Sequence, residues 1–225
     1  NIYLKMDYSI NRNLHLYGDF QNRSIQYHFE GLNDDTIFSD QSINLNFINP
    51  KFGIFYSLNP YSSIYTSYAI ANKEPNRDDY RESPPSDRPE HETLYDTEMG
   101  WKMQYDNISM QINLYHMSYN NQLVKTGEIN DVGESVHSNI KDSYRQGVEI
   151  ESSINLSPRF KWNGNICLSK NKIISHDEYI DNWDTWGTES IHHENTDIAF
   201  SPNIIASAEI NYGLKKIEAS WIIKH

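Results

Sequence analysis

The connections between the strand-like segments of this chain fall into two length classes, and this regularity limits the possible folds more than any other feature. Segments that alternate apolar and polar residues follow one another, which is typical of β-strands. Turns of two to four residues alternate with connections of ten to about twenty-eight residues. A soluble sandwich has no reason to sort its loops in this way, whereas an outer-membrane barrel has short turns at one end and long loops at the other. We expect the long connections at 31–41, 72–92, 120–142 and 174–201.

The two faces of the predicted strands differ in chemistry. In the segment 94–105, one face carries Tyr95, Thr97, Met99, Trp101, Met103 and Tyr105, and the other carries Asp96, Glu98, Gly100, Lys102 and Gln104. Charged side chains in a sandwich core would carry a large desolvation cost, but a water-filled lumen accommodates them. The pattern therefore predicts an all-β fold, namely an antiparallel up-and-down transmembrane β-barrel segment. The exposed face of a soluble antiparallel sheet is the alternative.

One strand is expected to be irregular. The segment 42–58 contains Asn49-Pro50, and proline cannot donate a hydrogen bond to a strand ladder, so we expect a bulge or kink there.

Composition and motifs remove several classes of function. The net charge is −12 without a basic cluster, so we expect no nucleic-acid partner. Cys167 is the only cysteine, which excludes an intrachain disulfide and a multi-cysteine zinc site. The sequence has no glycine-rich phosphate loop, no GxSxG and no HExxH. We therefore expect no enzyme, no catalytic residue, no cofactor and no resident metal.

Several stretches occur in an order and spacing that are specific together. They are NPKFG (49–53), YAIANKEPNRDDY (68–80), PEHETLYDTEMGWK (89–102) and SYRQGVEIE (143–151). From about residue 42 to 212 the chain resembles the β-barrel of TonB-dependent outer-membrane receptors, especially the type common in Bacteroidetes. The resemblance implies a wall of 22 antiparallel strands around a plug domain.

The chain holds only part of that pattern. About ten strands of a 22-stranded barrel are expected within 1–225, without the plug domain, the TonB box or the C-terminal strands of the family. We therefore expect a partial barrel domain. Ten strands with the tilt and curvature of so wide a wall cannot close, so the prediction is an open curved sheet with two unpaired edges.

The resemblance also implies a function and a location. TonB-dependent receptors of the Gram-negative outer membrane import iron chelates, cobalamin or, in some branches, oligosaccharides. The expected partners are outer-membrane lipid, an iron-chelate ligand such as a ferric siderophore, the plug domain and the TonB complex. Two alternatives stay open, namely a TonB-dependent oligosaccharide receptor and a cell-surface β-sheet module that binds glycans without transport.

The first candidate site follows a strand end that the resemblance places outside the cell. Asn76, Arg77 and Tyr80 are candidate ligand contacts there, because guanidinium matches carboxylate-rich or other anionic chelates bidentately. Alternatively, Glu74 and Arg77 brace the connection against the barrel wall.

The second candidate set is expected to line the lumen. It consists of Asp96, Glu98, Arg145, Glu149 and Glu151. These side chains could contact the plug or shape the electric field of the pathway. The alternative is a cross-strand ladder of opposite charges that simply makes the wall polar.

The third candidate region is the acidic connection 174–201. Trp183 and Trp186 could stack on an aromatic or sugar ring of a ligand, or pack the loop against its neighbours. Histidines and carboxylates at 176–178 and 192–194 include metal-ligand types, but no metal motif matches their spacing. Solvated loop residues are the favoured interpretation.

Overall fold

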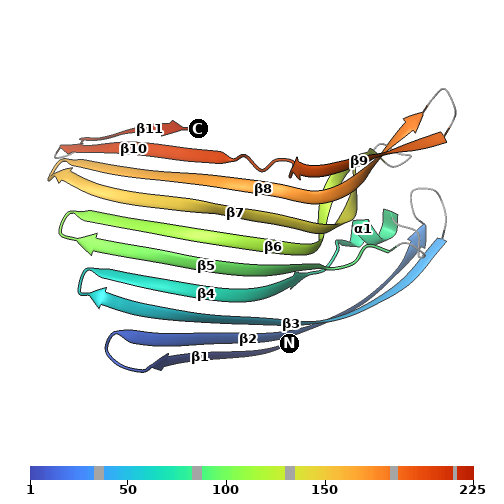
Figure 1. The fold of residues 1–225 in the computed structure, drawn as a ribbon, viewed down its shortest axis with the longest axis horizontal. Coiled ribbons are helices and arrows are strands. Elements are labelled where there is room, and N and C mark those ends of the chain that lie inside the picture. Colours follow the sequence, from blue (N-terminus) through green and yellow to red (C-terminus); the bar gives the residue numbers. More distant parts are fainter. Residues whose placement is uncertain (33–37, 83–87, 130–134, 183–186, 215–216) are drawn as a thin grey trace.

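Nearly all of the chain forms one antiparallel sheet (Figure 1). The computed structural model describes residues 1–32, 38–82, 88–129, 135–182, 187–214 and 217–225. The strands are β1 (Ile2–Ser9), β2 (Leu14–Leu32), β3 (Phe38–Asn59), β4 (Ser62–Lys73), β5 (Glu92–Tyr105), β6 (Ile108–Ile129), β7 (Ser135–Ser157), β8 (Phe160–Asn182), β9 (Gly187–Asp197), β10 (Ile204–Leu214) and β11 (Ile217–Lys224). The single described helix is α1 (Arg77–Glu82), which is too short to cross a lipid bilayer.

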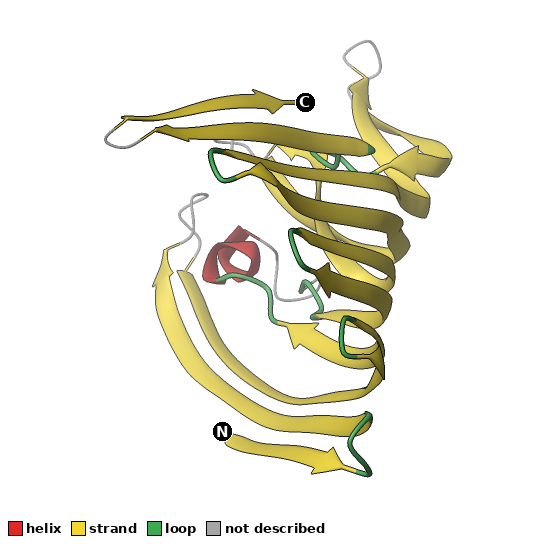
Figure 2. Cartoon of the chain, turned by 90° about the vertical axis from the view of Figure 1, so that its left-hand side faces the viewer, coloured by secondary structure: helices red, strands yellow, loops and turns green. Residues whose placement is uncertain are grey.

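The sheet is open and curved, which confirms the predicted fold class. Each strand from β1 to β8 pairs with its neighbour in sequence, and β10 and β11 follow on the far side of β8. Within the described residues, β1 pairs only with β2 and β11 only with β10, so both edges are unpaired. Figure 2 shows the strands as an arc with α1 on its inner side.

The short turns that the structure describes lie at one end of the sheet, at the left of Figure 1. Polar side chains close three of them by accepting backbone N–H groups. Asn11 Oδ1 accepts from Leu14 at 2.9 Å, Asn59 Oδ1 from Tyr61 at 2.9 Å, and Ser157 Oγ from Phe160 at 3.2 Å. Asp106 adopts a φ of 47°, a conformation that aspartate and asparagine tolerate in tight turns.

At the other end, three of the expected long loops are largely strand. The hairpins β2–β3, β6–β7 and β8–β9 continue beyond the rest of the wall, so the predicted loop bounds are wrong there. The acidic segment 174–201 contains the end of β8 and all of β9, paired from Lys172↔Asp197 to Asn182↔Gly187. Where this hairpin extends beyond the neighbouring strands, both of its faces carry polar residues. The alternation of apolar and polar residues that indicates a strand is therefore lost.

Pro50 does not produce the expected bulge. The β2–β3 register runs without a shift through Phe20↔Pro50. Instead, the β3–β4 ladder ends next to Pro50, at Lys51↔Ala69, because proline has no N–H to offer. Side chains replace the missing ladder, since Asn49 Oδ1 accepts the backbone N–H of Asn72 at 3.0 Å.

The register fixes which residues face the inner side of the arc. The Gln41 side chain donates to the Tyr80 carbonyl at 3.1 Å, and α1 lies on the inner side, so Gln41 points inward. Lys51 is an even number of residues further along the same strand and points the same way. Lys51 pairs with Ala69, and Ala69 pairs with Asp96. The alternating set of Asp96, Glu98 and Lys102 therefore faces the concave side.

The convex face carries the apolar set, and no described element covers it. Phe52 is 61% exposed and Met99 is 55% exposed. Among the residues that the structure describes, the buried large apolar side chains lie instead at the loop end. They are Ile43, Phe47, Tyr80, Ile140, Ile173 and Ile198. A one-layer sheet with an uncovered apolar outer face differs from a soluble sheet, which buries that face against a second layer.

Candidate functional site

The helix α1 begins at a capping box inside the long connection between β4 and β5. The backbone N–H of Asn76 donates to Asp79 Oδ2 at 2.6 Å, and Pro75 precedes the cap. Asparagine followed three residues later by an acidic residue is a helix-start signal. The sequence therefore contained the evidence for a helix that was not predicted, although six residues are too few to show a helical period.

Tyr80 anchors this helix to the wall. Its side chain is 3% exposed, and its ring meets the ring of Tyr27 edge-on at 6.2 Å. Burial raises the pKa of the Tyr80 hydroxyl. Because Tyr80 is covered by the wall, the candidate contacts open to a ligand here are Asn76 and Arg77, both exposed.

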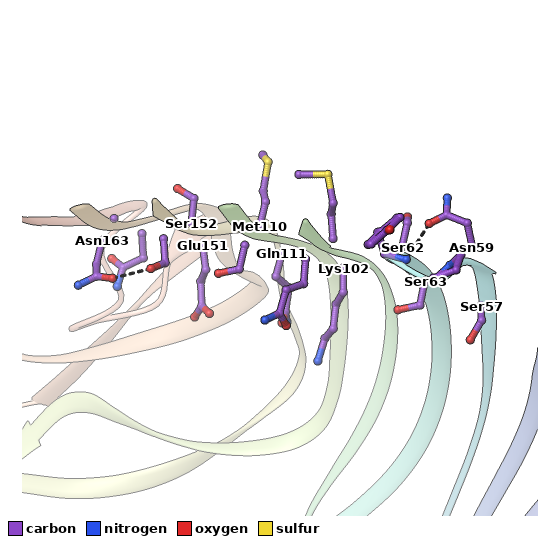
Figure 3. Close-up of a pocket in the computed structure, with 18 of the residues that line it drawn as sticks. Ser57, Asn59, Ser62, Ser63, Lys102, Met110, Gln111, Glu151, Ser152 and Asn163 are labelled. Carbon is purple, nitrogen blue, oxygen red and sulfur yellow. Dashed lines mark hydrogen bonds between the residues drawn. The ribbon is translucent and has the colours of Figure 1, made fainter. Parts of the chain in front are cut away.

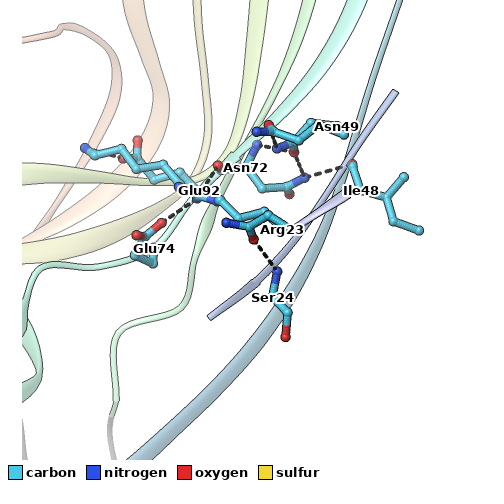
Figure 4. Close-up of polar contacts among 10 residues, drawn as sticks. Arg23, Ser24, Ile48, Asn49, Asn72, Glu74 and Glu92 are labelled. Carbon is cyan, nitrogen blue, oxygen red and sulfur yellow. Dashed lines mark hydrogen bonds and ion pairs between the residues drawn. The ribbon is translucent and has the colours of Figure 1, made fainter. Parts of the chain in front are cut away.

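An ion pair between Arg23 and Glu74 fixes the segment that leads into α1. The sequence analysis did not predict this pair. The Arg23 guanidinium forms an ion pair with Glu74 and donates to the Asn72 carbonyl at 3.2 Å (Figure 4). It also lies over the Phe47 ring, 5.2 Å from its centroid. The bracing role considered for Glu74 is thus present, with Arg23 as its partner.

These elements enclose a hollow of about 470 Å³ on the concave side of the loop end. Three of its lining side chains are cationic, in a chain whose net charge is −12. Arg23 and Lys73 are paired, with Glu74 and Glu92. Arg77 forms no ion pair with any residue that the structure describes, and its guanidinium lies 5.8 Å from the Phe29 ring centroid. The lining consists of Arg23, Tyr27, Lys73, Glu74, Pro75, Asn76 and Arg77.

A second hollow, of about 410 Å³, brings together three residues of the predicted lumen set, Glu98, Arg145 and Glu149. Arg145 donates to Ser201 Oγ at 2.7 Å, which ties the segment after β9 to the wall. Register places Arg145 opposite Met117 and Asn171, and Glu149 opposite Asn113 and Cys167. The five predicted residues therefore do not form the alternative cross-strand ladder of opposite charges.

The remaining lumen candidates, Asp96 and Glu151, lie on the same face, with Asp96 level with Arg145 through Met117. Glu151 lines a hollow of about 780 Å³ at the turn end, together with Lys102 and Gln111. Figure 3 shows these three side chains projecting to one side of the sheet, with Met110 and Ser152 on the other. Asp96 has one buried carboxylate oxygen, Oδ1, without a hydrogen-bond partner among the described residues.

The histidines and carboxylates of the acidic segment are ordered by the β8–β9 ladder. His192 Nδ1 is 2.7 Å from Asp177 Oδ1, and His193 Nε2 is 2.8 Å from Glu178 Oε2. Among the residues that the structure describes, no group of three or more His, Cys, Asp or Glu side chains is arranged to hold a metal ion. Trp183 and Trp186 lie outside the described residues.

A single-layer wall with a lipid-facing apolar side, a polar concave side and short turns at one end is a segment of a transmembrane β-barrel. The sequence matches the family described as "TonB dependent receptor-like, beta-barrel" over residues 1–222, so the chain belongs to the TonB-dependent receptor family. Proteins of this family are transporters and not enzymes, as the sequence led us to expect.

Solved structures show the same fold at low sequence identity. The ferric-catecholate import receptor Fiu of E. coli K12 in its closed form is 17% identical, with a TM-score of 0.70 over 95% of this chain and 32% of that chain. The siderophore receptor PiuA of Acinetobacter baumannii is 13% identical, with a TM-score of 0.74 over 93% and 30%. The copper transporter OprC is 10% identical, with a TM-score of 0.73 over 99% and 34%.

The chain spans about a third of the length of these structures. No curated protein sequence matches it. The fold and the family are therefore shown, whereas the ligand has to be argued from the site.

Proposed function

We propose that this chain is part of a Gram-negative outer-membrane receptor that imports a ferric siderophore or similar iron complex with energy delivered through TonB. Family membership supports transport, and the titles of the Fiu and PiuA structures name ferric-catecholate and siderophore receptors. In this proposal the turn end faces the periplasm, and α1 and the extended hairpins face the outside of the cell.

The observation that carries the ligand class is the cationic hollow beside α1. Siderophores bind Fe³⁺ through catecholate, hydroxamate or carboxylate oxygens, and many of the complexes are anionic. Arg77, exposed and without an ion-pair partner among the described residues, offers a guanidinium fork to such oxygens. Asn76 lies beside it as a further hydrogen-bonding group.

The polar concave face supplies the rest of the proposed pathway. Asp96, Glu98, Arg145, Glu149 and Glu151 would line a water-filled lumen occupied in part by the plug domain. Their register partners are uncharged, so the charges are available to a plug or a passing ligand in the intact receptor. Outer-membrane lipid would cover the convex face.

Uptake of radioactive iron by cells carrying the full receptor tests the proposal. We expect uptake of an iron chelate to depend on the receptor and on TonB, and Arg77→Gln to weaken chelate binding about tenfold, equivalent to about 1.4 kcal/mol for a lost charged contact. Arg159→Gln, at the turn end, is the matched control and should bind like the wild type. Receptor-dependent uptake of an oligosaccharide with no response to iron chelates would contradict the proposal and favour the oligosaccharide alternative.

A further inference from the structure

The β8–β9 hairpin places two histidines directly opposite each other. His176 and His193 are register partners, and their rings stack with centroids 5.2 Å apart and planes inclined by 23°. The loop interpretation of this segment gave these side chains no fixed geometry. The ladder supplies it, because facing residues of an antiparallel pair hold their Cβ atoms about 4.5–5.5 Å apart.

Each of the two rings uses one nitrogen on a protein partner. His193 Nε2 meets Glu178 Oε2 at 2.8 Å, and His176 Nδ1 meets Thr196 Oγ1 at 3.4 Å. Among the described residues, His193 Nδ1 and His176 Nε2 have no hydrogen-bond partner. In metal sites, a carboxylate or hydroxyl typically holds one ring nitrogen and so leaves the other as an oriented ligand.

We propose that His176 and His193 together bind one divalent first-row transition-metal ion of the kind that prefers imidazole, such as Cu²⁺, Ni²⁺ or Zn²⁺. Metal–nitrogen distances of about 2.0–2.1 Å place two ligating nitrogens roughly 3.3 Å apart, so both rings have to rotate out of the observed stack to share one ion. Two protein ligands leave the other coordination positions to water or to a small chelator. The site is distinct from the cationic hollow beside α1 and does not depend on the proposed iron-chelate function.

The same hairpin offers a matched control on its other face. His192 is paired through Nδ1 with Asp177 at 2.7 Å and through Nε2 with Glu194 at 3.8 Å, so carboxylates flank both of its nitrogens. A histidine whose two ring nitrogens are both engaged by carboxylates should not contribute to metal binding.

The test uses the full receptor purified in detergent, with Cu²⁺ alone as the probe and no siderophore present. Electron paramagnetic resonance of the wild type should show a copper species with two equatorial nitrogen ligands. His176→Gln and His193→Gln should each remove that species, whereas His192→Gln should retain it. Glu178→Gln should weaken Cu²⁺ binding about tenfold, as expected for the loss of an outer-shell partner.

A large excess of Zn²⁺ or Ni²⁺ should be needed to displace the same copper, because imidazole sites bind Cu²⁺ more tightly than either ion. Heat-modifiable migration on gels will establish that each variant forms a folded barrel before its spectrum is compared. The inference would be wrong if His176→Gln and His193→Gln retained the two-nitrogen species, or if His192→Gln removed it equally. Because the readout is binding of a bare ion, its failure would leave iron-chelate uptake unaffected, and failure of chelate uptake would leave this site intact.

Discussion

The β2–β3 hairpin has a lower half, near the short-turn end of the sheet, and an upper half, near the loop end. The two halves place their apolar residues on opposite sides of the sheet. In the lower half, the convex face carries Leu14, Leu16, Phe52 and Ile54, and the concave face is largely polar. Above the level of Asn22↔Ile48, the convex face carries polar residues such as Ser24, His28 and Asn44. There the apolar residues face inward, and they include Ile25, Tyr27, Phe29, Ile43 and Phe47.

The reversal occurs without any change in the strands themselves. The register continues unshifted across this level, so each side chain keeps its face, and only the surroundings change. In the lower half hydrocarbon lies outside, and in the upper half water lies outside while α1 and its connection cover the inner face. Which face of a strand is apolar therefore depends on the solvent at that height. The position where the apolar residues switch from the convex to the concave face marks where the wall leaves the membrane.

The largest expected effect comes from comparing two positions on the same face of β3, one inside the membrane and one above it. Ile54→Lys and Asn44→Lys both place a cation on the convex face of β3, one in the lower half and one above the switch. A lysine near the bilayer midplane costs about 2–4 kcal/mol, and this cost approaches zero near the interface. We expect Ile54→Lys to prevent assembly of the full receptor, measured by heat-modifiable migration of outer-membrane fractions, and Asn44→Lys to assemble normally. Failure of both variants would mean that the membrane extends above the switch.

The same free-energy cost distinguishes the two faces of one strand at the same height in the membrane. Ile150 and Glu151 are consecutive on β7 and point to opposite sides. Ile150→Lys should abolish surface display of the receptor, whereas Glu151→Lys should be tolerated because its side chain points to the concave, water-filled side. Labelling of intact cells with an antibody to an added epitope measures display. Equal display of the two variants would show that the assignment of inside and outside is incorrect.

A smaller effect is expected where tyrosines lie over glycines on the inner face of the lower half. Tyr65 and Gly100 are cross-strand partners, and a Cβ added at Gly100 would collide with the Tyr65 ring. The ring is held in place, since its hydroxyl donates to Asn113 Oδ1 at 2.9 Å. We expect Gly100→Ala to destabilise the barrel by about 1–3 kcal/mol, measured by urea unfolding in lipid vesicles.

Two controls accompany Gly100→Ala. Gly213→Ala should be neutral, because nothing lies within 4 Å of the added atom. Combining Gly100→Ala with Tyr65→Ala should cause no further loss beyond that of Tyr65→Ala alone, because the collision is gone. Additive losses in the double variant would show that the two residues do not interact.

The lower half of the molecule could be predicted from sequence, and the upper half only in part. Strict alternation through β5 and the turn at Asp106-Asn107 fixed both the strand and its faces, because hydrocarbon and water impose a period of two. In the upper hairpins, water wets the convex face and the inner face packs against loop residues, so the pattern inverts or fades. The pattern therefore predicts a loop over 174–201, where the end of β8 and all of β9 form a ladder.

Contacts between residues that are far apart in sequence could not be predicted, for a physical reason. Arg23 and Glu74 are 51 residues apart in sequence, and they meet only because β2, β3 and β4 are neighbours and Pro50 ends the ladder between the last two. His176 and His193 face each other only in one register of β8 and β9. By contrast, the capping box at Asn76 and Asp79 was readable locally and predicts the start of α1.

The smallest effect compares two ion pairs at the upper rim. The side chains of Arg23 and Glu74 are 29% and 31% exposed, and Arg23 also contacts Phe47 and the Asn72 carbonyl. The Lys73 side chain is 66% exposed and is paired with Glu92. Solvent-exposed pairs contribute about 0–1 kcal/mol, whereas a half-buried arginine with several partners contributes somewhat more. We expect Arg23→Gln to loosen the 72–92 connection and raise its cleavage rate by added protease several-fold, while Lys73→Gln leaves the rate unchanged. Equal cleavage of the two variants would show that Arg23 does not anchor α1, and that packing of Tyr80 alone holds the helix against the wall.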